Sequence, residues 1–322
     1  MHISNANLFY HKTEEFKREK LNYILCFCGE GYIIYDALTK NARKVDYMDK
    51  YDLIALDMDG TLLTSELNIS EETKAAIDKA VRSGKTVVLS TGRAPSEIIE
   101  YEEQLKNIRY YVCENGALLY DSWEKRTIYS QSFPQDIAEK LIKIAEIRDV
   151  MIYVVSNGRH MCTYKDVLRM GYFQIDQFQE FVLRTAVLHD DIIASYHREA
   201  FPIEKINFFS VSKESREELK NILEKLPLTA VYAEETSLEV SPLHMSKAVG
   251  LQRLCDYLSI PIRKVIAVGD SDNDSEILKI AGLSVAMGNA RQNIKELCDV
   301  VVADNNHDGC AEAIERYLLE CV

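Results

Sequence analysis

Two stretches of this chain combine a short run of apolar residues with acids placed directly at its end. Residues 53–59 read LIALDMD, and residues 265–270 read VIAVGD. A continuous apolar run of this length is typical of a strand buried on both faces of a parallel sheet. Carboxylates at the tip of such a strand are costly unless a positive charge meets them. We therefore expect a parallel sheet with a charged site at the carboxyl ends of its strands.

Strands and helices alternate around these two runs. A helix is expected after Ser70, which is placed to cap it, with an end near Gly84. A second helix is expected over residues 94–105 and a third over 275–282. Further strand candidates lie within residues 85–93, 108–121, 283–290 and 299–304. This alternation predicts an α/β fold with a doubly wound, Rossmann-like parallel sheet.

The region between the two halves of this pattern has a different character. Residues 134–239 hold two helical patterns and several strand candidates rich in aromatic and β-branched residues, which favours an α+β insert with an antiparallel sheet. We expect residues 51–133 and 240–322 to form the parallel-sheet core, with a cleft between the core and the insert. Residues 1–50 form an extension of unknown role, and residues 21–38 within it could form a hairpin.

The acids past the strand ends define the chemistry that the sequence favours. Asp57 and Asp59 follow one expected strand, and Asp270 and Asp274 follow another. Four carboxylates brought to one edge of a sheet repel one another unless a cation neutralises them. Oxygen ligands of this kind suit Mg²⁺, which usually keeps room for waters and a substrate phosphate.

Other polar residues at the same edge favour phosphate chemistry. A carboxylate can attack phosphorus when positive charge shields it, and a second carboxyl group can move the proton. Thr91 follows another strand and offers a hydroxyl, next to backbone amides that can bind phosphate oxygens. Lys247 lies in the first turn of an expected helix. A cation is unfavourable there, which indicates that an anion meets it.

The composition narrows the possible partners. The formal net charge is −13 and the sequence pI is about 5.1, which argues against nonspecific binding of nucleic acid or of an anionic membrane surface. The eight cysteines include a single close pair, Cys26 and Cys28, so reduced thiols in a cytoplasmic protein are expected. The chain has no apolar run of membrane-spanning length. We expect a small phosphorylated metabolite as partner, and the sequence identifies no protein partner.

Four motifs, in this order, resemble those of the haloacid-dehalogenase (HAD) superfamily. They are DMDGT at 57–61, STGR at 90–93, the Ser-Lys pair at 246–247 and GDSDND at 269–274. The large insert, with NGA at 115–117, AMGNA at 286–290 and NNHDG at 305–309, resembles the Cof-type branch, which has a type IIB cap. The resemblance covers residues 51–322. It implies a Mg²⁺-dependent phosphatase acting on sugar phosphates or other small phosphorylated metabolites.

The resemblance also implies a role for each matching residue. Asp57 would be the nucleophile, forming an aspartyl-phosphate, and Asp59 would be the general acid and base. The phosphate-binding residues would be Thr91, Gly92, Lys247 and Asn273. The metal site would involve Asp57, Asp59 through its backbone carbonyl, Asp270 and Asp274, the last supporting the metal or Lys247. Arg93 is equally compatible with a structural role, with a place at the hinge of the cap and with contact to substrate.

Two other functions are compatible with these residues. A phosphomutase-type phosphotransferase resembles this core but returns the phosphoryl group to a sugar. A sensor without catalytic activity would bind a phosphorylated ligand and signal to a partner. The complete set of acids argues against such a sensor, because binding alone does not need all of them.

Overall fold

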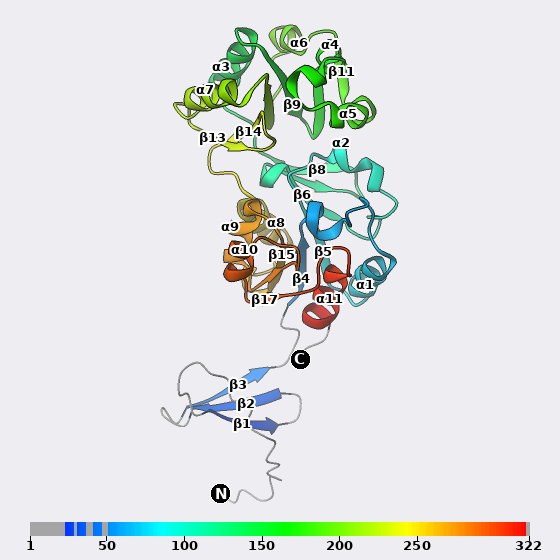
Figure 1. Ribbon diagram of the computed structural model, residues 1–322. Coiled ribbons are helices and arrows are strands. Elements are labelled where there is room, and N and C mark those ends of the chain that lie inside the picture. Colours follow the sequence, from blue (N-terminus) through cyan, green and yellow to red (C-terminus); the bar gives the residue numbers. More distant parts are fainter. Residues whose placement is uncertain (1–22, 29–30, 37–40, 47–50, 320–322) are drawn as a thin grey trace, which may run out of the picture. The chain divides into compact units, whose positions relative to one another are not determined.

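The computed structural model describes residues 23–28, 31–36, 41–46 and 51–319 (Figure 1). The chain divides into two compact units, residues 1–49 and 50–322. The first unit holds a three-stranded antiparallel sheet of β1 (Tyr23–Cys28), β2 (Gly31–Asp36) and β3 (Asn41–Asp46). The predicted hairpin is confirmed as β1 and β2, although its tip at 29–30 lies outside the described residues. β3 was not predicted.

The second unit contains an eight-stranded sheet with the order β17-β16-β15-β4-β5-β6-β7-β8. Neighbouring strands are parallel from β17 to β6, and β7 and β8 add to the edge in antiparallel pairs. The bounds of the strands are β4 Leu53–Leu56, β5 Thr86–Ser90, β6 Tyr110–Cys113, β7 Leu118–Asp121, β8 Arg126–Ser130, β15 Val265–Gly269, β16 Leu283–Ala286 and β17 Val300–Val301. All four residues of β4 are buried, as its apolar run predicts. This sheet confirms the predicted fold class.

Helices and short turns connect these strands. The α-helices are α1 Glu71–Arg82, α2 Pro95–Ile98, α8 Lys247–Leu258, α9 Ser275–Ile280, α10 Gln292–Leu297 and α11 Gly309–Ala313. The 3₁₀ or π turns are η1 Met58–Leu62, η2 Ile99–Tyr101, η3 Glu114–Gly116, η6 Ile262–Lys264, η7 Asp272–Asp274 and η8 Ile314–Leu319. Ser70 caps α1 as predicted, because its hydroxyl accepts a hydrogen bond from the backbone N–H of Thr73 at 3.1 Å.

The predicted helix over residues 94–105 is wrong. Only α2 is α-helical there, and η2 follows it as a tighter 3₁₀ turn. The adjacent isoleucines Ile98 and Ile99 are β-branched, which weakens helix propensity at this point. Ile98 and Leu105 are still buried in the core, so this segment keeps its apolar contacts without a continuous helix.

A second sheet, of six strands, follows the order β11-β10-β9-β12-β14-β13 (Figure 1). Its pairs are antiparallel except for the parallel pair of β10 and β11, which the sequence did not predict. The strands are β9 Val150–Ser156, β10 Arg159–Thr163, β11 Val187–His189, β12 Lys205–Ser210, β13 Leu228–Tyr232 and β14 Ser237–Pro242. The helices are α3 Gln135–Glu146, α4 Tyr164–Val167, α5 Gln179–Thr185, α6 Ile192–Glu199 and α7 Lys213–Leu223, with 3₁₀ turns η4 Met170–Phe173 and η5 Asp176–Phe178. The two predicted helical patterns correspond to α3 and α7.

Helices α3, α6 and α7 pack on the strands of the six-stranded sheet. They share one apolar cluster with one face of that sheet, which includes Ile206 and Phe208 of β12. In the described part of the chain, no helix is both long enough and apolar enough to cross a membrane. The cysteines whose side chains are described are free thiols.

Candidate active site

The tips of β4 and β15 bring the first two acids together. These strands are parallel neighbours, with Leu56 opposite Val268. Asp57 follows β4, and its backbone N–H donates a hydrogen bond to the Val268 carbonyl at 3.1 Å. Asp270 follows β15 directly. Gly60 has φ +78°, and a Cβ there would lie 2.6 Å from Asp270 Oδ2, so only glycine allows the turn after β4 to approach this acid.

Lys247 lies buried between two of the predicted acids. It is the first residue of α8, and its Nζ donates to Asp57 Oδ1 and, at 2.7 Å, to Asp274 Oδ1. α8 reaches this position through a close contact with η3, where a Cβ on Gly250 would lie 2.5 Å from the Gly116 Cα. Burial lowers the pKa of Lys247, but the two carboxylates raise it above its ordinary value. The lysine is therefore a fixed positive charge.

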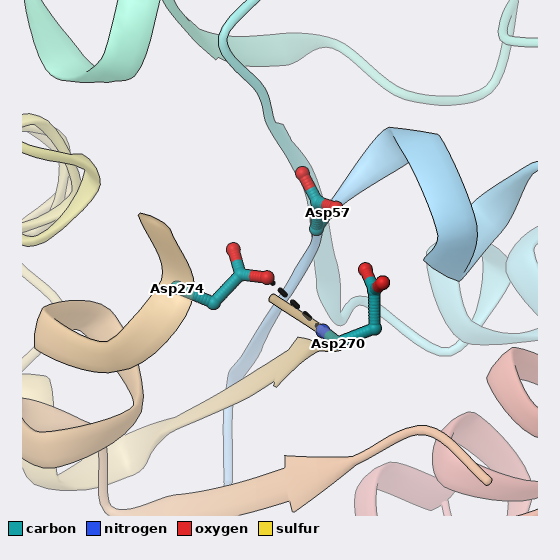
Figure 2. A group of neighbouring side chains, drawn as sticks. All are labelled: Asp57, Asp270 and Asp274. Carbon is teal, nitrogen blue, oxygen red and sulfur yellow. Dashed lines mark hydrogen bonds between the residues drawn. The ribbon is translucent and has the colours of Figure 1, made fainter. Parts of the chain in front are cut away.

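The three acids Asp57, Asp270 and Asp274 form one cluster. Each can offer an oxygen such that all three oxygens lie within 4.8 Å of one another. Figure 2 shows the Asp57 side chain at the tip of β4 beside Asp270, which follows β15, and Asp274, which ends the helical turn η7. Burial raises the pKa of Asp57; Lys247 lowers it, and the other two acids raise it again, with a net rise well above its ordinary value. A buried, oxygen-only cluster with more negative than positive charge fits a hard divalent cation such as Mg²⁺.

Asp274 accepts hydrogen bonds from three groups of the chain around it. One of its oxygens accepts the bond from Lys247, and the other accepts from the backbone N–H groups of Asp270 at 3.0 Å and Ser271 at 3.2 Å. Asp270 Oδ1 instead accepts from the Thr61 hydroxyl at 3.0 Å. Since both oxygens of Asp274 already have donors, Asp57 and Asp270 are the acids with more capacity for a metal ion.

Of the predicted phosphate-binding residues, Gly92 and Asn273 lie at the mouth of this cluster. Gly92 and Asn273 line a cavity of about 250 Å³ together with Asp57 and Asp59. Thr91 is buried and is not among the residues that line this cavity. Its hydroxyl accepts a hydrogen bond from the backbone N–H of Arg93 at 3.1 Å. The structure thus brings Gly92 and Asn273 to the predicted acids, whereas Thr91 is buried directly after β5 and does not line the cavity.

Arg93 contacts the predicted acid and base directly. Its Nε and Nη2 donate to the two oxygens of Asp59 at 2.9 and 2.6 Å. The guanidinium also lies over the rings of Tyr101, at 5.5 Å, and Phe181, at 5.9 Å. Sequence reasoning left the role of Arg93 open. The structure shows that Arg93 binds Asp59 and also contacts Phe181, a residue of the insert.

Residues of the six-stranded sheet also line the mouth, and sequence reasoning missed them. Lys205, Asn207 and Glu239 border the same cavity as Asp57. The Lys205 Nζ donates to the Gly92 carbonyl at 2.8 Å and to Glu239 at 3.2 Å. The polar residues at alternate positions in KINFFS were the available signal, because alternate residues of a strand share one face.

Asparagines of two motifs near the end of the chain hydrogen-bond to the turn after β4. Asn289 Nδ2 donates to the Gly60 carbonyl at 2.7 Å, and Asn305 Nδ2 donates to the Leu63 carbonyl at 2.8 Å. These bonds hold the turn that carries Asp59. The asparagines of AMGNA and NNHDG therefore position the first motif.

Fold and site together define a class of protein: an α/β enzyme with a parallel sheet, whose acids and one buried lysine meet past the strand ends. A family model for haloacid dehalogenase-like hydrolases matches residues 54–314. The chain belongs to this family, which confirms the resemblance drawn from its motifs. Curated relatives that are 31–32% identical are named phosphatases, and the chain is an enzyme of this HAD-type phosphatase class.

Similar proteins extend over most of the chain. Phosphatase YwpJ of Bacillus subtilis is 32% identical and aligns with 83% of this chain and 99% of its own length. The 5-amino-6-(5-phospho-D-ribitylamino)uracil phosphatase YitU of the same organism is 31% identical, over 82% of this chain and 97% of its own. A solved haloacid dehalogenase-like hydrolase from B. subtilis, 30% identical, superposes with a TM-score of 0.71 over 83% of this chain and all of its own.

Proposed function

We propose that this enzyme hydrolyses a phosphomonoester of a small metabolite through an aspartyl-phosphate on Asp57, with Mg²⁺ as cofactor. The observation that carries the proposal is the buried Lys247, bonded to both Asp57 and Asp274 beside Asp270. This arrangement offers one carboxylate next to a fixed positive charge at the bottom of an open cavity. Such a site suits in-line attack on a phosphoryl group.

In the first step an Asp57 oxygen attacks phosphorus, and the bond between phosphorus and the leaving oxygen breaks. Protonated Asp59 gives its proton to that oxygen, so the product leaves as an alcohol. Lys247 stabilises the negative charge on the phosphoryl oxygens, and the Gly92 and Asn273 groups at the mouth bind them. Mg²⁺ held by Asp57 and Asp270, with the Asp59 carbonyl, would supply further positive charge at the same oxygens.

In the second step Asp59 takes a proton from water, and the water oxygen attacks phosphorus. The bond to Asp57 breaks, inorganic phosphate leaves, and Asp57 is restored as a carboxylate. Asp59 has to exchange its bonds with Arg93 for a bond to the leaving group during this cycle, because both of its oxygens now accept from the guanidinium. Arg93 is thus placed to hold Asp59 until a substrate arrives.

The core and the insert have separate roles in the proposed reaction. Residues 51–133 and 240–322 carry the phosphoryl chemistry, and the 134–239 insert, whose last strand β14 extends to Pro242, acts as a cap that contacts the leaving group. Sugar phosphates are candidate substrates, and the relatives named for 5-amino-6-(5-phospho-D-ribitylamino)uracil add a polyol phosphate to the candidates.

The test is phosphate release from a panel of sugar, nucleotide and cofactor phosphates, with Mg²⁺ and with EDTA, for the wild type and Asp57→Asn. Mg²⁺-dependent release that Asp57→Asn abolishes supports the proposal. Dependence on a sugar bisphosphate with little free phosphate would instead identify a phosphomutase. Tight binding of a phosphomonoester without turnover would identify a sensor.

A further inference from the structure

The six-stranded sheet presents one row of side chains on the face opposite α3, α6 and α7. On β12, Ile206 and Phe208 pack under α3, α6 and α7, so Lys205, Asn207 and Phe209 share the opposite face. The strand register places Asn207 opposite Tyr153 of β9. Tyr153 and Asn207 therefore lie side by side on the face opposite α3, α6 and α7, where Tyr153 also packs in a cluster with Val167 of α4 and Val182 of α5.

This face forms one wall of a cavity of about 660 Å³. Asp59 and Arg93 lie at one end of the lining, so the cavity begins where the leaving group of a bound phosphate ester would be. Besides charged and polar residues, the lining includes a group of aromatic and apolar side chains: Tyr153, Met170, Phe178, Phe181 and Phe209. A cavity of this size accommodates a ligand much larger than one sugar ring.

Two polar atoms in this wall have no hydrogen-bond partner among the described residues. They are the Tyr153 hydroxyl and the Asn207 Oδ1, and both are buried. Burial also raises the pKa of Tyr153, so its hydroxyl keeps its proton and can donate. A buried polar group without a partner is unfavourable, and a ligand that supplies the partner gains affinity from it. The wall thus offers a hydroxyl donor and an amide acceptor, set among aromatic rings.

We propose that the leaving group of the substrate is a hydroxylated chain or sugar that ends in a planar heteroaromatic ring, with Tyr153 and Asn207 as specificity-determining residues. The ring stacks among Phe178, Phe181 and Phe209, and its polar edge pairs with Tyr153 and Asn207. The hydroxylated part spans the polar stretch near Arg93 and Lys205, where both side chains line the cavity. This inference rests on the proposed function, since it names the substrate class for the same site.

The experiment compares kcat/KM for phosphates with and without a ring on the same chain. Ribitol 5-phosphate and ribose 5-phosphate lack a heteroaromatic ring, and flavin mononucleotide and uridine 5′-monophosphate carry one. We expect kcat/KM to be about tenfold or more higher for at least one ring-bearing phosphate, because stacking of a single ring supplies that much. Equal values for both classes would overturn the inference.

Two variants test the wall itself. Tyr153→Phe removes only the unpartnered hydroxyl, and Phe181→Leu removes a ring. Each should lower the ratio of ring-bearing to ringless kcat/KM several-fold, through KM. Tyr164→Phe is the matched control, because Tyr164 is an exposed tyrosine of α4 outside the cavity lining. A ratio that stays at the wild-type value in both cavity variants would refute the assignment of these residues.

Binding of the dephosphorylated products separates this inference from the proposed function. Riboflavin and uridine carry the ring but no phosphate, and calorimetry measures their affinity without any turnover. Absence of phosphate release from every compound would refute the proposed function alone. Failure of both ring-bearing products to bind better than ribitol, in an enzyme that does release phosphate, would refute the inference alone.

Discussion

Lys247→Met is the substitution that most directly tests the charge balance of the site. Methionine keeps most of the length of the lysine side chain but removes its positive charge. The Lys247 side chain is buried, and it bonds to Asp57 and Asp274, which are also buried. In the variant these two carboxylates face each other, with Asp270 beside them, without a compensating cation from the chain.

The magnitude follows from the distances. Oxygens of Asp57 and Asp274 can lie within 4.8 Å of each other, and two unit charges at that distance repel by about 3.5 kcal/mol at an effective dielectric constant of about 20. Removal of one partner from a buried ion pair typically costs about 3–5 kcal/mol. We therefore expect Lys247→Met to lower the free energy of unfolding by about 3 kcal/mol in EDTA, and Mg²⁺ to restore part of the loss.

Denaturant unfolding of the full chain, with EDTA and with Mg²⁺, measures this loss. Lys264→Met is the matched control, because Lys264 pairs with Asp52 at 2.8 Å in a partly exposed ion pair whose loss should cost less than about 1 kcal/mol. The double variant Lys247→Met/Asp274→Asn should recover stability, since it removes one of the repelling charges. Equal stability of Lys247→Met and the wild type in EDTA, or no recovery in the double variant, would refute the reasoning.

Three further predictions concern other groups. Asp57→Asn should reduce phosphate release to background while the unfolding curve stays cooperative; activity near the wild-type level would exclude Asp57 as nucleophile. Burial raises the pKa of Glu114 well above its ordinary value, and neither of its oxygens has a partner among the described residues. Protonated Glu114 therefore favours folding below about pH 4.3, and this contribution to stability is lost as pH rises. Glu114→Gln should be about 1–3 kcal/mol more stable than the wild type at pH 7.5 and equally stable near pH 4. Burial lowers the pKa of His160, which contacts Glu97 at 3.1 Å, so its contribution is present above about pH 6.5 and lost as pH falls. The melting temperature of His160→Gln should therefore fall less than that of the wild type between pH 7.5 and 5, and parallel curves would contradict this.

The local sequence pattern was sufficient to predict the central strands of the core sheet and the helix that begins at Lys247. The apolar runs before Asp57 and Asp270 are buried strands in the structure, and Lys247 begins a helix as predicted. These features are set by residues close together in sequence, so periodicity and capping reveal them. The helix expected over 94–105 failed because its apolar spacing is also compatible with a short α-helix followed by a 3₁₀ turn, and the β-branched Ile98 and Ile99 weaken a continuous helix.

The sequence by itself determined at which edge of the sheet the acids gather, because parallel strands end at one edge and the acids follow directly after them. Only the tertiary structure decided what those acids contact. Arg93 meets Asp59, Lys205 meets Gly92, and Tyr153 stands opposite Asn207, each across a long separation in sequence. Such contacts depend on the register and packing of whole sheets, which no local pattern encodes. For this enzyme, the position of the acid cluster was predictable from the sequence, whereas the cavity wall beside it was a result of the fold.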